Sequence, residues 1–125
     1  MVVDDSVAIL RVLALGLERA GYEVLTACDG VDALLKIRDG QPDFLITDIE
    51  MPRMTGQELC QAIEKDYPDR TFPIVVMTTS TEPSHRQWAA NIRHADFIEK
   101  PVSIRLLVAH VNRCLDEPHT AAAPI

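Results

Sequence analysis

The 125-residue sequence predicts an α/β domain in which five parallel strands form a doubly wound sheet with helices on both faces. Two short apolar runs, Phe44–Ile46 and Ile74–Met77, contain no charged residue, which is typical of strands covered on both faces. Strand-like and helix-like segments alternate along the chain, and right-handed crossovers place the helices on both faces. Because the two uncharged runs belong in the middle and the mixed segments at the edges, the expected strand order is 2-1-3-4-5.

The other three strands are shorter or more polar. Met1–Val3 forms the first strand, Tyr22–Thr26 a partly solvated edge strand, and Ala95–Ile98 the opposite edge. Five helices are expected from apolar residues at helical spacing: Val7–Ala20, Val31–Arg38, Gln57–Lys65, a helix opened by Glu82-Pro83-Ser84 that includes Trp88 and Ile92, and Ile104–Leu115. Ser6 and Asp29 are expected N-caps, and Gly21 follows the end of the first helix.

The length fits one domain, which we place at residues 1–115. Residues 116–125 contain two prolines and three consecutive alanines without apolar periodicity, so we expect a flexible tail or the start of a linker. A natural chain end and a cut from a longer protein remain equally open here.

Composition excludes several classes of protein. The net charge of −7 argues against direct nucleic-acid binding. The longest uncharged stretch, Thr71–Thr81, is far shorter than the roughly 20 apolar residues of a membrane span. Asp4 and Asp5 stand where a signal peptide needs positive charge. The three cysteines form no C-x-x-C pair and no metal-ligand spacing with the four histidines, so we expect buried free thiols in the cytoplasm.

Polar side chains follow four of the predicted strands. Asp4 and Asp5 follow the first strand, Asp48 the third, Thr78 the fourth and Lys100 the fifth. Alone, each is an ordinary turn, cap or strand-end residue. In a doubly wound sheet, however, ligands bind at the carboxyl ends of the strands. The joint occurrence at one end of one sheet therefore favours a functional site.

The residue types suggest the chemistry of that site. Three neighbouring carboxylates repel one another unless a counter-charge is present. Mg²⁺ supplies it, since this ion prefers oxygen ligands and typically takes one or two carboxylates together with waters. A cation, a lysine and a hydroxyl around a carboxylate suit phosphoryl transfer, in which aspartate can act as the nucleophile and form an acyl phosphate.

Over residues 1–115 the sequence resembles the receiver domain of bacterial response regulators, the CheY-like family. The segment D-I-E-M-P-R-M-T-G from Asp48 to Gly56 matches the phosphorylation-site pattern D-x-x-M-P-x-M-x-G of that family in full. The acidic pair Asp4-Asp5, Met77-Thr78-Thr79 and Lys100-Pro101 match as well. The resemblance implies a flavodoxin-like fold and a phosphorylatable switch of two-component signalling that is not an enzyme, although it takes part in its own phosphotransfer and dephosphorylation.

The resemblance also implies roles for individual residues. Asp48 would accept a phosphoryl group from a histidine kinase or a histidine phosphotransfer protein. Asp5, Asp48 and the backbone carbonyl of Glu50 would bind Mg²⁺ directly, and Asp4 would hold it through water. Lys100 would pair with the phosphoryl oxygens.

A second set of residues would transmit the change. Thr78 would turn its hydroxyl to the phosphoryl group, and Phe97 matches the aromatic position whose rotamer follows. The Lys100-Pro101 peptide bond would be cis. The face of the fourth helix, fifth strand and fifth helix would then bind a downstream output protein or domain, and pairing of two copies through this face is left open.

Three positions depart from the family pattern. The first strand is short, which predicts reduced stability. Thr79 stands where a small residue is usual, so we expect slow labelling by small phosphodonors. His94 replaces a common glycine, which predicts a strained turn or a different path.

Three other classes of protein fit the sequence less well. A haloacid-dehalogenase-like phosphatase would carry D-x-D-x-T after its first strand, whereas Asp48 follows the third. A flavodoxin-like redox carrier would need a Ser/Thr/Gly-rich loop in place of Asp4-Asp5-Ser6-Val7. An interaction domain that is never phosphorylated would have no need of the Asp48, Thr78 and Lys100 set.

Overall fold

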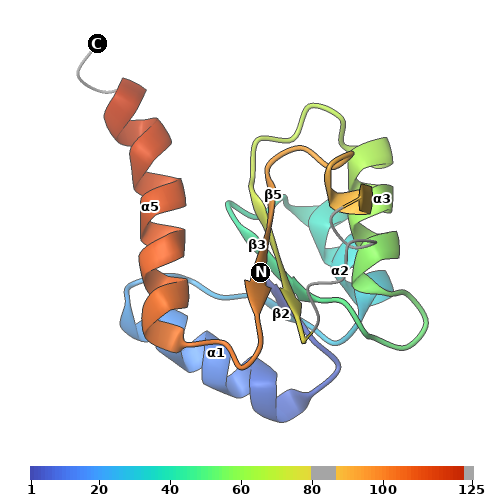
Figure 1. Ribbon diagram of the computed structural model, residues 1–125, viewed down its shortest axis with the longest axis horizontal. Helices are drawn as coiled ribbons and strands as arrows, with labels where there is room; N and C mark the ends of the chain where they lie inside the picture. Colours follow the sequence, from blue (N-terminus) through green and yellow to red (C-terminus); the bar gives the residue numbers. More distant parts are fainter. Residues whose placement is uncertain (80–86, 123–125) are drawn as a thin grey trace.

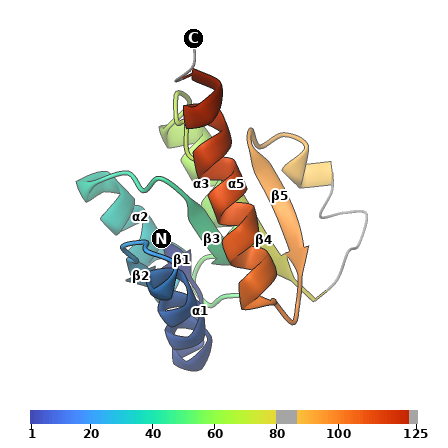
Figure 2. The ribbon, with the colours of Figure 1, turned by 90° about the vertical axis from the view of Figure 1, so that its left-hand side faces the viewer.

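The computed structural model describes residues 1–79 and 87–122, and within them the chain forms a five-stranded parallel sheet of order β2-β1-β3-β4-β5. This confirms the predicted fold and strand order. Helices α1 and α5 cover one face of the sheet and α2 and α3 cover the other (Figure 1 and Figure 2). The bounds are β1 Val2–Val3, α1 Val7–Arg19, β2 Thr26–Ala27, α2 Gly30–Asp39, β3 Leu45–Asp48, α3 Gly56–Asp66, β4 Ile74–Thr78, β5 Ala95–Glu99 and α5 Ile104–Ala122.

The sheet separates two apolar cores. On the α1/α5 side, Val75 and Met77 of β4 pack with apolar residues of both helices. On the α2/α3 side, Ile74 and Val76 of the same strand pack with those of α2 and α3. All five residues of β4 are buried, so both faces of this strand are apolar up to its last residue, Thr78. This is why the sequence of the central strands shows continuous apolar runs rather than alternation.

The first edge strand is shorter than expected. We predicted a strand over Tyr22–Thr26, but β2 comprises only Thr26–Ala27. A strand needs a neighbour along its length, and β1 offers only Val2 and Val3 for pairing. Residues 22–25 lie beyond this short ladder, so only the bond from Val2 N to Leu25 O, 2.8 Å, continues the pairing.

The helix ends follow the sequence signals closely. Ser6 and Asp29 are the N-caps of α1 and α2, and Gly21, with φ of 100°, follows the end of α1. The cap of α3 was missed: Thr55 and Glu58 form a capping box there. The pattern T-x-x-E in the sequence is the signal that could have found it.

The last helix is longer than the sequence predicted. The helix α5 continues to Ala122, so residues 116–122, which we assigned to a tail, are helical. Local backbone hydrogen bonds can extend a helix without the apolar stripe on which the tail prediction relied.

The start of the predicted helix at Glu82-Pro83-Ser84 lies outside the described residues. Residues 87–89 are helical, with Trp88 buried.

The cysteines are free, but only Cys60 is buried. Cys28 is exposed because it follows the edge strand β2, and Cys114 is half-buried on α5. The prediction that these two cysteines are buried was therefore wrong. Burial raises the pKa of Cys60 to about 12. His94 has φ of 54°, which confirms the expected strain in the turn before β5.

Candidate functional site

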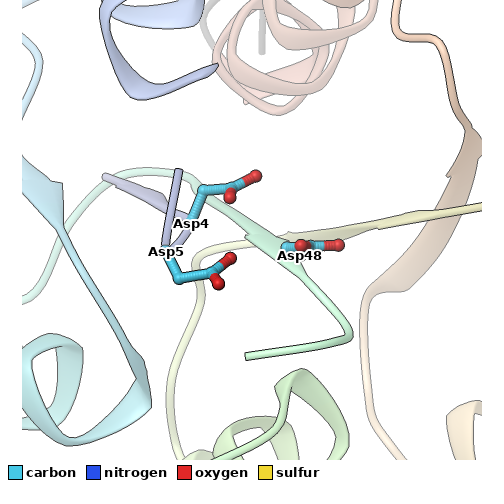
Figure 3. A group of neighbouring side chains, drawn as sticks. All are labelled: Asp4, Asp5 and Asp48. Carbon is cyan, nitrogen blue, oxygen red and sulfur yellow. The ribbon is translucent and has the colours of Figure 1, made fainter. Parts of the chain in front are cut away.

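Three carboxylates meet at the carboxyl end of the sheet. Asp4 and Asp5 follow β1 and Asp48 ends β3, and one carboxylate oxygen from each lies within 4.8 Å of the others. Figure 3 shows the side chains of Asp4 and Asp5 directed toward the side on which Asp48 lies. Asp4 and Asp48 are buried, whereas Asp5 is exposed. The cluster is therefore open to solvent on the Asp5 side.

The register of the sheet brings these side chains together. Val3, the last residue of β1, pairs with Thr47 of β3, so Asp4 follows at the level of Asp48, the last residue of β3. Asp48 in turn pairs with Met77 of β4, which places Thr78 one residue further along. A shift of one residue in either ladder would turn Asp48 to the other face. The buried strand pattern thus fixes the geometry of the cluster.

Lys100 supplies the positive charge of the site. Its Nζ lies 2.8 Å from Oδ1 of Asp48, and the backbone N–H of Lys100 donates to the carbonyl of Thr78 at 2.7 Å. The Lys100-Pro101 peptide bond is cis, which confirms that expectation. Asp48 Oδ1 also accepts a hydrogen bond from the backbone N–H of Ile49 at 2.9 Å. The carboxylate of Asp48 is therefore held in one orientation by two donors.

Asp4 is held differently. Its Oδ1 accepts from the backbone N–H of Ser6 at 2.9 Å, but its buried Oδ2 has no partner among the described residues. The pKa of Asp4 is raised overall, chiefly by burial and also by the nearby Asp48 carboxylate, and the hydrogen bond from Ser6 opposes this shift. An unpartnered buried oxygen beside two further carboxylates is a donor set that fits a divalent cation with oxygen ligands, either directly or through water.

Thr78 and Phe97 lie on the same face of the sheet. Phe97 of β5 pairs with Val76, and both pack in the α2/α3 core. Thr78 follows Val76 by two residues, so its side chain points to that same face. Phe97 is half-buried, and its ring meets Trp88 edge-on with centroids 5.6 Å apart. Side-chain packing could thus link the end of β4 to the surface near Trp88.

The end of the loop between β3 and α3 packs closely against the backbone of Asp48. A Cβ on Gly56 would lie 2.2 Å from the carbonyl oxygen of Asp48, so only glycine permits this packing. The backbone N–H of Gly56 donates to the carbonyl of Ile49 at 2.7 Å. Glu50 is exposed within the loop. The final glycine of the sequence motif is therefore required by sterics.

An ion pair in the same loop was missed by the sequence analysis. Arg53, with φ of 65°, donates to the carboxylate of Asp29, the N-cap of α2. The backbone N–H of Asp32 and this guanidinium lower the pKa of Asp29. A loop arginine and a helix cap 24 residues away carry no pairing signal in the sequence.

The comparisons with known proteins agree on one family. Residues 1–112 match the family described as the response regulator receiver domain. The chain is 34% identical to the alkaline phosphatase synthesis transcriptional regulatory protein PhoP of Bacillus subtilis over 98% of its length. It is 35% identical to the probable transcriptional regulator ycf27 of Pyropia yezoensis over 92% of this chain. It spans about half the length of these curated relatives, 50% and 46% respectively.

Solved structures give the same result. The chemotaxis protein CheY4 of Vibrio cholerae superposes with a TM-score of 0.84 at 35% identity, covering 91% of this chain and 95% of that one. A CheY-like receiver domain protein of Methanospirillum hungatei gives 0.86 at 30% identity, covering 97% and 95%. In the part of the chain that the structure describes, no helix is long and apolar enough to cross a membrane. The chain belongs to the family of response regulator receiver domains, the signalling modules of two-component systems.

Proposed function

We propose that this receiver domain accepts a phosphoryl group on Asp48 from a histidine kinase or a histidine phosphotransfer protein. The observation that carries the proposal is the contact of Lys100 Nζ with Asp48 Oδ1 at 2.8 Å beside two further carboxylates. An oxygen of Asp48 attacks the phosphorus of a phosphohistidine. The new O–P bond forms an acyl phosphate as the N–P bond breaks, and the imidazole nitrogen leaves with the electron pair and takes up a proton.

A divalent cation, Mg²⁺, fits the remaining carboxylates. Asp5, Asp48 and the backbone carbonyl of Glu50 are its proposed direct ligands, and Asp4 would hold it through water. When bound, Mg²⁺ neutralises charge on the phosphoryl oxygens. Lys100 would exchange its contact with Asp48 for one with a phosphoryl oxygen. The buried Asp4 Oδ2 supports this proposal, since it would gain a water or cation partner.

The attached group would act as a switch through Thr78 and Phe97. Phosphorylation adds about −1.5 to −2 charge and three strong acceptors. The Thr78 hydroxyl is the neutral donor at the end of β4 that can answer it, and its movement would change the packing on the face it shares with Phe97. The surface of residues 87–89, β5 and α5 would then change its affinity for a downstream output domain or protein. The domain would also catalyse loss of its own phosphoryl group.

Intact-mass spectrometry tests the acceptor. After incubation with Mg²⁺ and acetyl phosphate, the wild-type chain should gain the mass of one phosphoryl group, and hydroxylamine should remove it because an acyl phosphate is reactive. Asp48→Asn should gain nothing, while the control Asp39→Asn, on the exposed end of α2, should label normally. A gain that survives Asp48→Asn would remove Asp48 as the acceptor. Failure with acetyl phosphate and with a range of kinases would favour an interaction domain that is not phosphorylated.

A further inference from the structure

The middle of the β3–α3 loop is fastened to the start of α2 by two neighbouring contacts. The guanidinium of Arg53, whose side chain is 67% exposed, pairs with the carboxylate of Asp29, which is 2% exposed. Beside this pair, Met54 packs against Gly30 so closely that a Cβ on Gly30 would lie 2.7 Å from the Met54 side chain. One charged and one apolar contact thus join the loop to α2.

The backbone of the loop depends on such support. Arg53 has φ of 65°, a left-handed conformation that is uncommon for residues other than glycine, asparagine and aspartate. The backbone N–H of Met54 donates to the carbonyl of Pro52 at 2.7 Å, which makes the turn tight. An arginine does not favour this conformation on its own. The ion pair forms at the strained residue itself and can hold it there.

The ends of the loop are fixed by other contacts. On one side, the N–H of Ile49 donates to the side chain of Asp48. On the other, Gly56 donates to Ile49 and packs on the carbonyl of Asp48. Glu50 lies between this fixed end and the Arg53–Asp29 pair. The Glu50 backbone therefore lies between two anchored points of the loop.

We propose that Asp29 and Arg53 are positioning residues for the cation site. Their ion pair holds the β3–α3 loop so that its backbone can complete the set of oxygen ligands, and it thereby sets the affinity for the divalent cation. This inference rests on the proposed function, in which the Glu50 carbonyl is a ligand. Neither residue of the pair is itself a proposed ligand.

Titration with Mn²⁺, followed by loss of the free-ion electron paramagnetic resonance signal, tests the proposal without any phosphoryl transfer. Mn²⁺ shares the oxygen-ligand preference of Mg²⁺. Asp29→Asn keeps an N-cap acceptor for α2 but removes the charge. Arg53→Gln removes the opposite charge. We expect each variant to bind Mn²⁺ roughly three- to tenfold more weakly, below the 10- to 100-fold typical of partners that touch a metal ligand directly.

The signs of the two effects separate positioning from a simple electric field. If only the local charge mattered, Asp29→Asn would weaken cation binding and Arg53→Gln would strengthen it. A positioning pair predicts weakening in both, no further loss in the double variant, and partial recovery in Arg53→Lys.

A matched control is Arg93→Gln, which removes another exposed arginine from its ion pair with Glu64, at the opposite end of the sheet. It should leave Mn²⁺ affinity unchanged. Wild-type or tighter Mn²⁺ binding by Arg53→Gln would overturn the positioning role while leaving the proposed function intact. If the wild-type chain binds no Mn²⁺, the proposed cation site itself is wrong, and the positioning role falls with it.

Discussion

At the scale of single residues, Gly56 and Thr79 show how the sterics around Asp48 decide what the site tolerates. Gly56 allows α3 to begin against the carbonyl of Asp48. Thr79 is exposed and lines a cavity of about 390 Å³ together with Lys100 and apolar residues of α1. The first residue packs against the backbone of Asp48, and the second is exposed next to Thr78 at the end of β4.

Gly56→Ala is expected to destabilise the domain by about 1–3 kcal/mol, because the added methyl group meets backbone atoms that cannot move aside cheaply. The gain in helix propensity, about 1 kcal/mol, only partly offsets this cost. Urea denaturation measures the change. Gly40→Ala is the matched control, since nothing lies within 4 Å of a Cβ there, and it should be neutral or slightly stabilising. Equal stability of Gly56→Ala and wild type would contradict the close approach.

Thr79→Ala is expected to increase the rate of labelling by acetyl phosphate severalfold, because a smaller side chain widens access to Asp48. The initial rate of mass gain at saturating Mg²⁺ measures it. Thr71→Ala, an exposed threonine ahead of β4, provides the control. Unchanged labelling in Thr79→Ala, or rapid labelling of the wild type, would show that Thr79 does not restrict access.

The sequence was sufficient to predict that the three carboxylates and Lys100 lie together. Each candidate residue ends a strand or follows one, and in a parallel sheet the carboxyl ends of the strands meet at one edge. The residues are Asp4, Asp5, Asp48, Thr78 and Lys100. The Arg53–Asp29 pair was not predictable, because it joins a loop to a helix cap through a left-handed turn. The buried Arg70, paired with Glu64, was missed for the same reason: both contacts depend on how loops fold back on helices.

At the scale of elements, β1 is a very short strand for the middle of a sheet. It has only two residues, and the ammonium of Met1 continues its ladder by donating to the carbonyl of Phe44 at 2.7 Å. Burial lowers the pKa of this ammonium from 8.0 to about 6. A charged group therefore occupies a position where a strand would have a neutral amide.

An extension of three apolar residues before Met1 should stabilise the domain, since it replaces the buried ammonium by an amide and can lengthen β1. Thermal melts of the extended and present chains measure the gain. Three polar residues such as Gly-Ser-Gly make a control that removes the charge without favouring a strand. An unchanged Tm in both extended chains would contradict the expectation.

The same ammonium predicts a pH dependence. Its pKa is lower in the folded than in the unfolded chain, so between pH 6 and pH 8 the unfolded chain binds more protons. Stability should therefore rise with pH through this window, by roughly 2–3 kcal/mol at most. Either extended chain should lose this rise. Denaturation curves at pH 6, 7 and 8 measure it, and parallel pH profiles of extended and present chains would refute the assignment.

The helix starts, the central strands and the β5 edge were predicted more successfully than the β2 edge. Caps and apolar periodicity are local signals, and Ser6, Gly21 and Asp29 act where the sequence placed them. Strand length at the β2 edge depends on what a neighbour offers, which is not local. The shortened β2 follows from the shortness of β1 rather than from its own residues.

At the scale of the whole molecule, a divalent cation should stabilise the fold. A cation that binds only the folded state adds about 2.7 kcal/mol at a concentration 100 times its dissociation constant. Melts in Mg²⁺ and in EDTA at matched ionic strength should therefore differ by several degrees for the wild type and much less for Asp5→Asn. Equal effects of Mg²⁺ on both chains would contradict a site at the acidic cluster.

The register of the sheet has a further consequence for its internal motions. β1 is joined to β3 through two paired residues, whereas β4 and β5 share five. Local opening should therefore separate β1 from β3 sooner than β4 from β5. Deuterium should reach the amide of Ile46, which donates to the carbonyl of Met1, sooner than the amides of β4. Asp5 and Asp48 stand on opposite sides of this seam. A cation held by both carboxylates would join the ends of the two strands, so slower deuterium exchange at the Ile46 amide would report occupancy of the site.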